Sequence, residues 1–267
     1  MILDFFNNWR VDCPPWACEL GLLREHQAIV KRHRRLAGAW ASHLTASREA
    51  ILAAAARCPQ RRSVLIIGAG DCLDVPVAEL AATFERVVLA DIVVGVEARR
   101  WARKLPGRVR CESWDASGAL AVVAAVKDCM TSAQALTIFS TFPAGAPPGG
   151  EPDLVVSANC ISQLGLVPGH SLPAKEQDSS LPDRCAQAAA RQHVLWLGMR
   201  PGVRLLLADV ARLNISADGR EIKRESLSER YGLKQPDRQW RWNLAPIPEW
   251  SPDFHRVHEV GAWIYAG

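Results

Sequence analysis

The chain has 267 residues, 49% of them apolar, and a formal net charge of +4 at pH 7. These values predict a folded chain with a sizeable core and argue against disorder. The longest apolar stretch, GALAVVAAV at 118–126, is too short to cross a bilayer, and MILDFFNNWRVD at the N-terminus lacks a basic leader and an apolar core, so we expect no membrane span and a cytoplasmic protein.

The first 60 residues are predicted to be helical, with one helix over 46–58 that ends before Pro59. The basic run KRHRR at 31–35 lies among apolar residues at helical spacing. We therefore interpret its charges as the solvated face of an amphipathic helix, which makes nucleic-acid binding unlikely. The eight cysteines form no CxxC pair and no Cys/His series, which predicts reduced thiols and no structural metal.

From Ser63 onward, predicted strands alternate with predicted helices. This alternation predicts a doubly wound α/β domain with a mostly parallel sheet over 61–267, preceded by a helical extension over 1–60. The tail at 254–266 is predicted to form two short strands around Gly261. The predicted strands before it are 63–67, 86–91, 108–115, 153–160 and 202–210, and the predicted helices are 75–84, 96–105, 118–130 and 182–199.

The stretch SVLIIGAGDCLD at 63–74 predicts a strand, a tight turn and the start of a helix. Gly68 and Gly70 let the backbone approach a ligand, and the N–H groups that follow suit negative charge. Asp91 ends the second strand, from which a carboxylate can accept hydrogen bonds from both ribose hydroxyls. NAD enzymes and S-adenosylmethionine-dependent methyltransferases share this arrangement, but Leu73 in place of the third glycine of GxGxxG disfavours NAD. Asp115 ends the third strand, where it is placed to accept from an adenine amino group beside Trp114.

In chain order, the sequence contains VLIIGAGD, VVLAD, CESWD, LVVSANCISQL, GVRLLLADV and a closing strand pair. On these motifs, residues 63–267 resemble the class I S-adenosylmethionine-dependent methyltransferase family. The resemblance implies a seven-stranded Rossmann-like methyltransferase sheet, S-adenosyl-L-methionine as cofactor and methyl transfer to a small-molecule acceptor. The cofactor contacts that we expect on this basis are Gly68, Ala69, Gly70, Asp71, Asp91, Ile92, Trp114, Asp115, Ser157 and Asn159.

Two departures from the family pattern keep other functions open. Ile66 stands where the family often has an acid, and Cys72 stands where it often has a third glycine. A non-catalytic methyltransferase-like binding or partner subunit is therefore one alternative, and an NAD(P)-dependent oxidoreductase is a second.

Methyl transfer needs a general base only if the acceptor must lose a proton. The candidates are His170 in the loop 165–183, His255 and His258 on either side of the predicted sixth strand, Tyr231 before that strand, and Asp209 at the predicted end of the fifth strand. Trp240 and Trp242 lie in the segment 238–250, where the resemblance implies a substrate-recognition insertion, although core packing explains them equally well.

Overall fold

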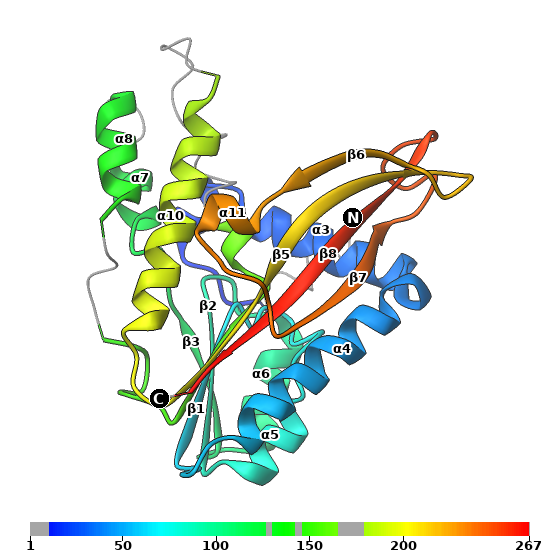
Figure 1. Cartoon of the computed structure of the whole chain (residues 1–267). Coiled ribbons are helices and arrows are strands. Elements are labelled where there is room, and N and C mark those ends of the chain that lie inside the picture. Colours follow the sequence, from blue (N-terminus) through cyan, green and yellow to red (C-terminus); the bar gives the residue numbers. More distant parts are fainter. Residues whose placement is uncertain (1–10, 127–129, 142–145, 165–178, 267) are drawn as a thin grey trace, which may run out of the picture.

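The structure is a computed structural model that describes residues 11–126, 130–141, 146–164 and 179–266. Its centre is an eight-stranded sheet in the order β3-β2-β1-β4-β5-β8-β7, with β6 paired to β5 beside this path (Figure 1). The strands are β1 (Ser63–Ile67), β2 (Arg86–Asp91), β3 (Val109–Ser113), β4 (Leu154–Ala158), β5 (Val203–Ser216), β6 (Glu221–Ser226), β7 (Arg238–Ala245) and β8 (Phe254–Tyr265).

The strands β1 to β5 are parallel, and β8 runs antiparallel between β5 and β7. Helices cover both faces of this sheet (Figure 1), so the predicted Rossmann-like α/β fold class is confirmed. The helices are α2 (Pro15–Glu19), α3 (Leu22–Arg35), α4 (Ala37–Ala56), α5 (Val77–Thr83), α6 (Val96–Lys104), α7 (Leu120–Val126), α8 (Ser132–Phe139), α10 (Leu181–Gly198), α11 (Ser228–Tyr231) and the 3-10 turn η1 (Ile161–Gln163).

The core has two layers because successive side chains of each strand point to opposite faces. On β1, Val64 and Ile66 pack with α4, α5 and α6, whereas Leu65 and Ile67 pack with α7, α8 and α10. A parallel strand covered on both faces must be apolar throughout, and all five residues of β1 are buried. This requirement explains why the predicted bounds of β1 and β2 are confirmed residue for residue.

The helix α4 covers the β7 end of the sheet (Figure 1). The connection from β5 to β7 contains β6 and the four-residue α11, so it supplies no long helix for this face. Trp40 of α4 takes part in closing the face: its indole is 2% exposed, and its Nε1 donates a hydrogen bond to the carbonyl of Leu244. The boundary at residue 60 stays a prediction, and α4 packs on the strands of the following domain.

Three predictions for the C-terminal part are wrong. The tail forms the single strand β8 through Gly261, and the segment expected to be an insertion contains the strand β7. These two differences cancel in the strand count, and the additional strand β6 gives the sheet eight strands where seven were expected. The strand β5 continues past Asp209 to Ser216, with a shift of register between Asp209 and Ala211. Pairing across the sheet favours long strands here, and short-range sequence patterns do not report it.

Within the described residues, no helix is both long enough and apolar enough to cross a membrane. None of the described cysteines forms a disulfide, and two of them are close: the Sγ atom of Cys13, which precedes α2, lies 2.9 Å from that of Cys18 within α2. Burial, together with the neighbouring Cys18 and Asp12, raises the pKa of Cys13 to about 12, which keeps this thiol protonated at neutral pH.

Candidate functional site

The candidate site lies at the carboxyl ends of β1, β2, β3 and β4. The chain runs outward from β1 to β3 and then returns to β4 on the other side of β1, so the sheet has its topological switch point between β1 and β4. In open α/β sheets, ligands bind at the carboxyl ends of the strands beside such a point.

The two glycines of the turn after β1 have different surroundings. A Cβ on Gly68 (φ +77°) would lie 2.7 Å from the Cβ of Cys160 and 2.8 Å from the carbonyl oxygen of Ala158. A Cβ on Gly70 (φ +47°) would meet only Oδ2 of Asp91, at 3.7 Å. Gly68 therefore lets the turn pack against the end of β4, and Gly70 leaves open space beside a carboxylate.

Asp91 points toward the turn. Its Oδ2 accepts a hydrogen bond from the Gly70 N–H at 2.8 Å, and its Oδ1 accepts one from the Val93 N–H at 3.1 Å. Burial raises the pKa of Asp91, and the two N–H groups together with nearby His26 partly offset this. Each oxygen has a second lone pair, so the carboxylate can still accept from two hydroxyl groups of a ligand.

Two other predicted cofactor contacts serve the local structure. Asp71 accepts a hydrogen bond from the Glu97 N–H at 2.9 Å, so it satisfies the first turn of α6. The carbonyl of Ile92 accepts from the Ser113 hydroxyl, and the Ile92 side chain packs at the edge of the core beside Trp114. The roles of Asp71 and Ile92 toward a ligand stay predictions.

Trp114 and Asp115 follow β3. The Trp114 ring is half-buried, with its centroid 5.5 Å from that of Trp196. Both oxygens of Asp115 accept hydrogen bonds from its own turn: Oδ1 from the N–H and hydroxyl of Ser117, and Oδ2 from the Leu120 N–H at 2.8 Å. Asp115 thus caps α7, and its role toward an adenine amino group stays a prediction.

The end of β4 carries Ser157 and Asn159. The Ser157 hydroxyl lies 2.9 Å from Nε2 of buried His193 and 3.4 Å from Sγ of Cys160. Asn159 has the left-handed φ of +51°, which is uncommon for a residue with a side chain and is concentrated at functional sites. Its Nδ2 donates to Oδ2 of Asp74 at 2.7 Å, while its buried Oδ1 has no partner within the described residues.

The buried histidine beside β4 predicts a loss of stability in acid. Burial lowers the pKa of His193 to about 4, with the Ala116 carbonyl partly offsetting it, so the folded chain holds this ring neutral where the unfolded chain protonates it. Stability is therefore expected to fall as the pH drops from about 6.5 toward 4, by about 2 to 3 kcal/mol for this residue at pH 4.5.

Urea unfolding at pH 7 and pH 4.5 measures this effect. In the double variant His193→Phe/Ser157→Ala, which removes the ring and the hydroxyl that faces it, the difference between the two pH values should shrink by that amount. An unchanged difference would show that His193 is not held neutral.

The helix α3 reaches the site from the N-terminal side. His26 lies close enough to Asp91 to lower the pKa of that carboxyl, and the His33 ring centroid is 5.7 Å from that of Trp40. None of the 14 side chains of α3 is buried, although the helix carries apolar residues along one side. This arrangement is expected of a helix that covers the space of a ligand.

The C-terminal end of α3 is fixed to the loop between β7 and β8. Arg35 Nη2 donates to Oε1 of Glu249 at 2.5 Å, and Arg32 Nε approaches the same oxygen at 3.4 Å. A 14-residue helix is about 21 Å long. It therefore extends from the neighbourhood of Asp91 to the β7–β8 loop, and the predicted amphipathic helix is confirmed in this position.

A second cluster lies on the α4 side of the sheet, next to the end of β4. Asp209 and His258 are both buried, with Oδ1 of Asp209 3.1 Å from Nδ1 of His258. The ring of Trp242 stacks on His43 at 4.1 Å and meets His258 edge-on at 5.8 Å. The structure thus brings Asp209, Trp242 and His258, all singled out from the sequence, together with His43, which was not predicted.

The remaining candidates are placed elsewhere. Trp240 donates from Nε1 to Nδ1 of His43 at 3.0 Å, which ties β7 to α4. His255 accepts from the Ile247 N–H at 3.0 Å and supports the β7–β8 loop. His170 lies outside the described residues.

Sequence reasoning offered His258 as a candidate base without pairing it with Asp209, and it did not place His43 in the site. The one local signal for His43 is its position three residues after Trp40 on the same helix face. His258 reaches Asp209 through the β5–β8 pairing, which joins residues 49 positions apart. No group of three or more His, Cys, Asp or Glu side chains among the described residues is arranged to hold a metal ion.

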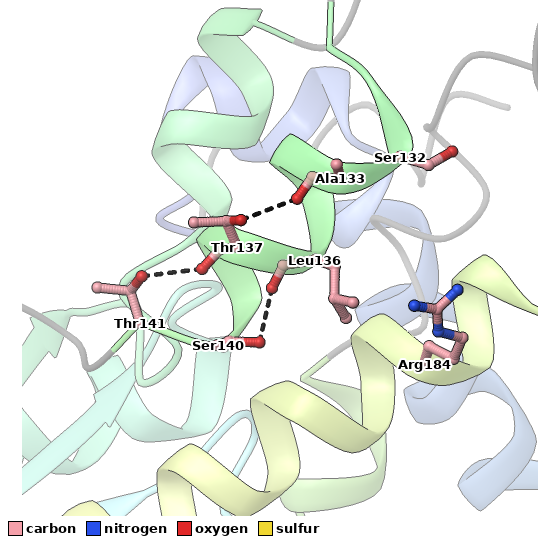
Figure 2. A pocket seen from close by; sticks show the side chains of 7 residues that line it. All are labelled: Ser132, Ala133, Leu136, Thr137, Ser140, Thr141 and Arg184. Carbon is pink, nitrogen blue, oxygen red and sulfur yellow. Dashed lines mark hydrogen bonds between the residues drawn. The ribbon is translucent and has the colours of Figure 1, made fainter.

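Figure 2 shows an open hollow of about 710 Å³ between α8 and α10. The hydroxyls of Thr137, Ser140 and Thr141 on its wall donate to carbonyls of their own helix. The hollow contains none of the residues at the strand ends and no pair of facing acid and base groups. The carboxyl edge of the sheet therefore stays the candidate site.

No protein-family model matches the sequence, and no curated protein matches it. Among solved structures, the chain is similar to the 1,6-didemethyltoxoflavin-N1-methyltransferase of Burkholderia thailandensis, with 16% identity over 90% of this chain and 89% of that chain and a TM-score of 0.37. It is also similar to a SAM-dependent methyltransferase of Leishmania major (15% identity, 82% and 71% covered, TM-score 0.36) and to an amino pentose methyltransferase of Micromonospora echinaspora (16%, 79% and 89%, TM-score 0.32). At these identities and TM-scores, the function has to be argued from the chain's own site.

Proposed function

We propose that the chain binds S-adenosylmethionine at the carboxyl edge of β1, β2 and β4 and catalyses transfer of its methyl group to a small-molecule acceptor. The observation that carries the proposal is the pairing of Gly70 with Asp91: a bare backbone position next to a half-buried carboxylate, at the carboxyl ends of β1 and β2.

The residues present fit an adenosyl ligand with an amino acid group. Asp91 retains two acceptor sites for the ribose hydroxyls, and Gly70 leaves the space that their approach requires. Trp114 offers the face of a ring beside the adenine position. The unpartnered Oδ1 of Asn159 is a buried acceptor that suits the ammonium group of the ligand.

When bound, the cofactor supplies a methyl group on a positively charged sulfur: the acceptor's lone pair bonds to that carbon while the sulfur keeps the electron pair of the broken bond. The protein's part is to align the reactants and exclude water, and alignment can supply about 7–11 kcal/mol of the barrier. The cover formed by α3, fixed at Glu249, fits the exclusion of water.

Calorimetric titration tests the proposal. The wild-type chain is expected to bind S-adenosylmethionine and S-adenosylhomocysteine with micromolar affinity. Asp91→Asn should weaken binding at least about tenfold, because a charge-assisted acceptor is worth roughly 1.5–3 kcal/mol. Asp209→Asn, which changes a carboxylate of the second cluster, serves as the matched control and should keep the wild-type affinity.

Three outcomes separate the alternatives. Binding of NADPH without binding of S-adenosylmethionine would overturn the proposal in favour of an oxidoreductase. Binding of S-adenosylmethionine without turnover of any acceptor would indicate a binding or partner subunit. Equal loss of affinity in Asp91→Asn and Asp209→Asn would show that the effect does not come from a ribose contact.

A further inference from the structure

The second cluster contains three buried titratable groups, His43, Asp209 and His258. Asp209 on β5 is 7% exposed and His258 on β8 is 8% exposed, and they face each other across the strand pair. The β5–β8 register shifts at Asp209, and a bulge of this kind re-aims a side chain. We call Asp209 and His258 the β5–β8 dyad.

The neighbours of Asp209 keep its carboxylate ionised. Burial alone would raise the pKa of Asp209, but the charge and hydrogen bond of His258, followed by Arg212 and the Ser162 hydroxyl, hold it below its ordinary value. Because Asp209 faces Nδ1, the proton of a neutral His258 ring is favoured on Nδ1. The lone pair of Nε2 is then directed away from Asp209.

The dyad lies next to the end of β4. His43 interacts electrostatically with Asp74, Asp209 and His258, and Asp74 in turn accepts the hydrogen bond of Asn159. Burial lowers the pKa of His43 to about 4, so that ring is neutral at physiological pH. The base candidate and the residue proposed to hold the cofactor's amino group are thus linked through two neighbouring side chains.

The cluster also leaves a donor unsatisfied. The buried Nε1 of Trp242 has no hydrogen-bond partner within the described residues, although His43 stacks on the ring and His258 meets it edge-on. A buried indole N–H usually has a partner. Water or a ligand with an acceptor atom is the expected partner.

We propose that His258, oriented by Asp209, is the base that takes the proton of the methyl acceptor, and that the acceptor is a planar aromatic compound with an ionisable N–H or O–H. This inference rests on the proposed function. The proton leaves the acceptor nitrogen or oxygen for Nε2 of His258 and gives an imidazolium opposite the Asp209 carboxylate. The acceptor keeps the electron pair for the new bond to carbon, and the imidazolium later releases its proton to water.

The side chains of the second cluster favour a planar aromatic acceptor. Trp242 and the neutral His43 ring are aromatic and stack on each other, and aromatic rings favour contact with a flat apolar ring. The carboxylates of Asp74 and Asp209 favour an acceptor that donates hydrogen bonds over one that carries negative charge. The titratable or charged groups beside the dyad are His43 of α4, which interacts with both members and with Asp74, and Arg212 of β5, which interacts with Asp209 and is the register partner of His258.

The test measures methyl transfer from S-adenosylmethionine to matched compounds. The aromatic members 2-naphthol and benzimidazole should be methylated; 2-methoxynaphthalene and 1-methylbenzimidazole, which have no proton to lose, and the aliphatic cyclohexylamine should not. In His258→Gln, kcat is expected to fall by roughly 100-fold with KM changed less than threefold, as for loss of a general base. Methylation of cyclohexylamine alone, or of no compound in the panel, overturns the assigned acceptor class.

The split between kcat and KM separates the positioning role of Asp209 from a structural one. Asp209→Asn removes the charge opposite the imidazolium that forms at His258, so kcat should fall by about tenfold while KM changes less than threefold. A wild-type kcat in Asp209→Asn, or a wild-type rate in His258→Gln, overturns the assignment.

A binding measurement on the same preparations keeps the two proposals apart. The ¹H–¹³C signal of the His258 ring should shift when 2-naphthol is added to the chain loaded with S-adenosylhomocysteine, and no shift counts against the dyad. Both dyad variants should bind S-adenosylhomocysteine as the wild type does. Failure of the wild type to bind S-adenosylhomocysteine refutes the proposed function. Normal binding together with a wild-type methylation rate in His258→Gln refutes only this inference.

Discussion

Replacing Gly68 by alanine is expected to destabilise the chain by about 3 kcal/mol or more, because the new Cβ would meet the backbone of β4 at a left-handed φ. Replacing Gly70 by alanine should cost only about 1 kcal/mol, since its Cβ has ordinary contact distance to Asp91. The same Gly70→Ala substitution should weaken S-adenosylmethionine binding by about 100-fold, because the methyl group fills the space of the ligand.

Urea unfolding and calorimetric titration of the two variants measure this contrast. The account requires the loss of stability at Gly68 and the loss of binding at Gly70. A stable Gly68→Ala chain, or a Gly70→Ala chain that binds S-adenosylmethionine normally, would contradict the separate roles of these two glycines.

Replacing Trp40 by alanine is expected to destabilise the chain by about 3–5 kcal/mol, the usual cost of removing a buried aromatic side chain. The indole is 2% exposed, meets the Trp242 ring edge-on at 4.9 Å and donates a hydrogen bond to the Leu244 carbonyl. Because α4 is the helix that covers β7, this loss should loosen the β7 end of the sheet first.

Thermal unfolding of Trp40→Ala and of the control Trp40→Phe measures the effect. Phenylalanine keeps a ring at the Trp242 contact and loses the hydrogen bond, so it should recover more than half of the lost stability. A Trp40→Ala chain as stable as the wild type would show that α4 does not hold this part of the sheet.

The parallel half of the fold is predictable from the sequence because its signals are local. A strand buried on both faces reads as a continuous apolar run, and the runs at Ser63–Ile67 and Arg86–Asp91 end where the structure ends β1 and β2. The Gly-Ala-Gly turn and Asp91 follow these strands directly, so their meeting at one sheet edge was also predictable.

The antiparallel half depends on pairing between distant segments. RQWRWNLA at Arg238–Ala245 is half polar and carries two tryptophans, and it becomes β7 because β8 and α4 bury one face of it. The composition of such a segment fits an exposed insertion equally well. The β5–β8 dyad depends on this same pairing, which is why Asp209 and His258 were each candidates from the sequence but were not predicted as a pair.

The two glycines illustrate a limit of motif reading. The sequence predicts that Gly68 and Gly70 both serve a ligand, and only the position of Cys160 after β4 shows that Gly68 is required by packing. Likewise, Asp115 lies at the predicted strand edge, but its hydrogen bonds to Ser117 and Leu120 are local and belong to the start of α7.

Amide hydrogen exchange with and without S-adenosylhomocysteine reports where this ligand binds. Slower exchange is expected only in the backbone at 68–73, 92–95 and 114–117, the three turns that follow β1, β2 and β3. Unchanged exchange in these turns, or protection only at the hollow between α8 and α10, would contradict the assignment of the site.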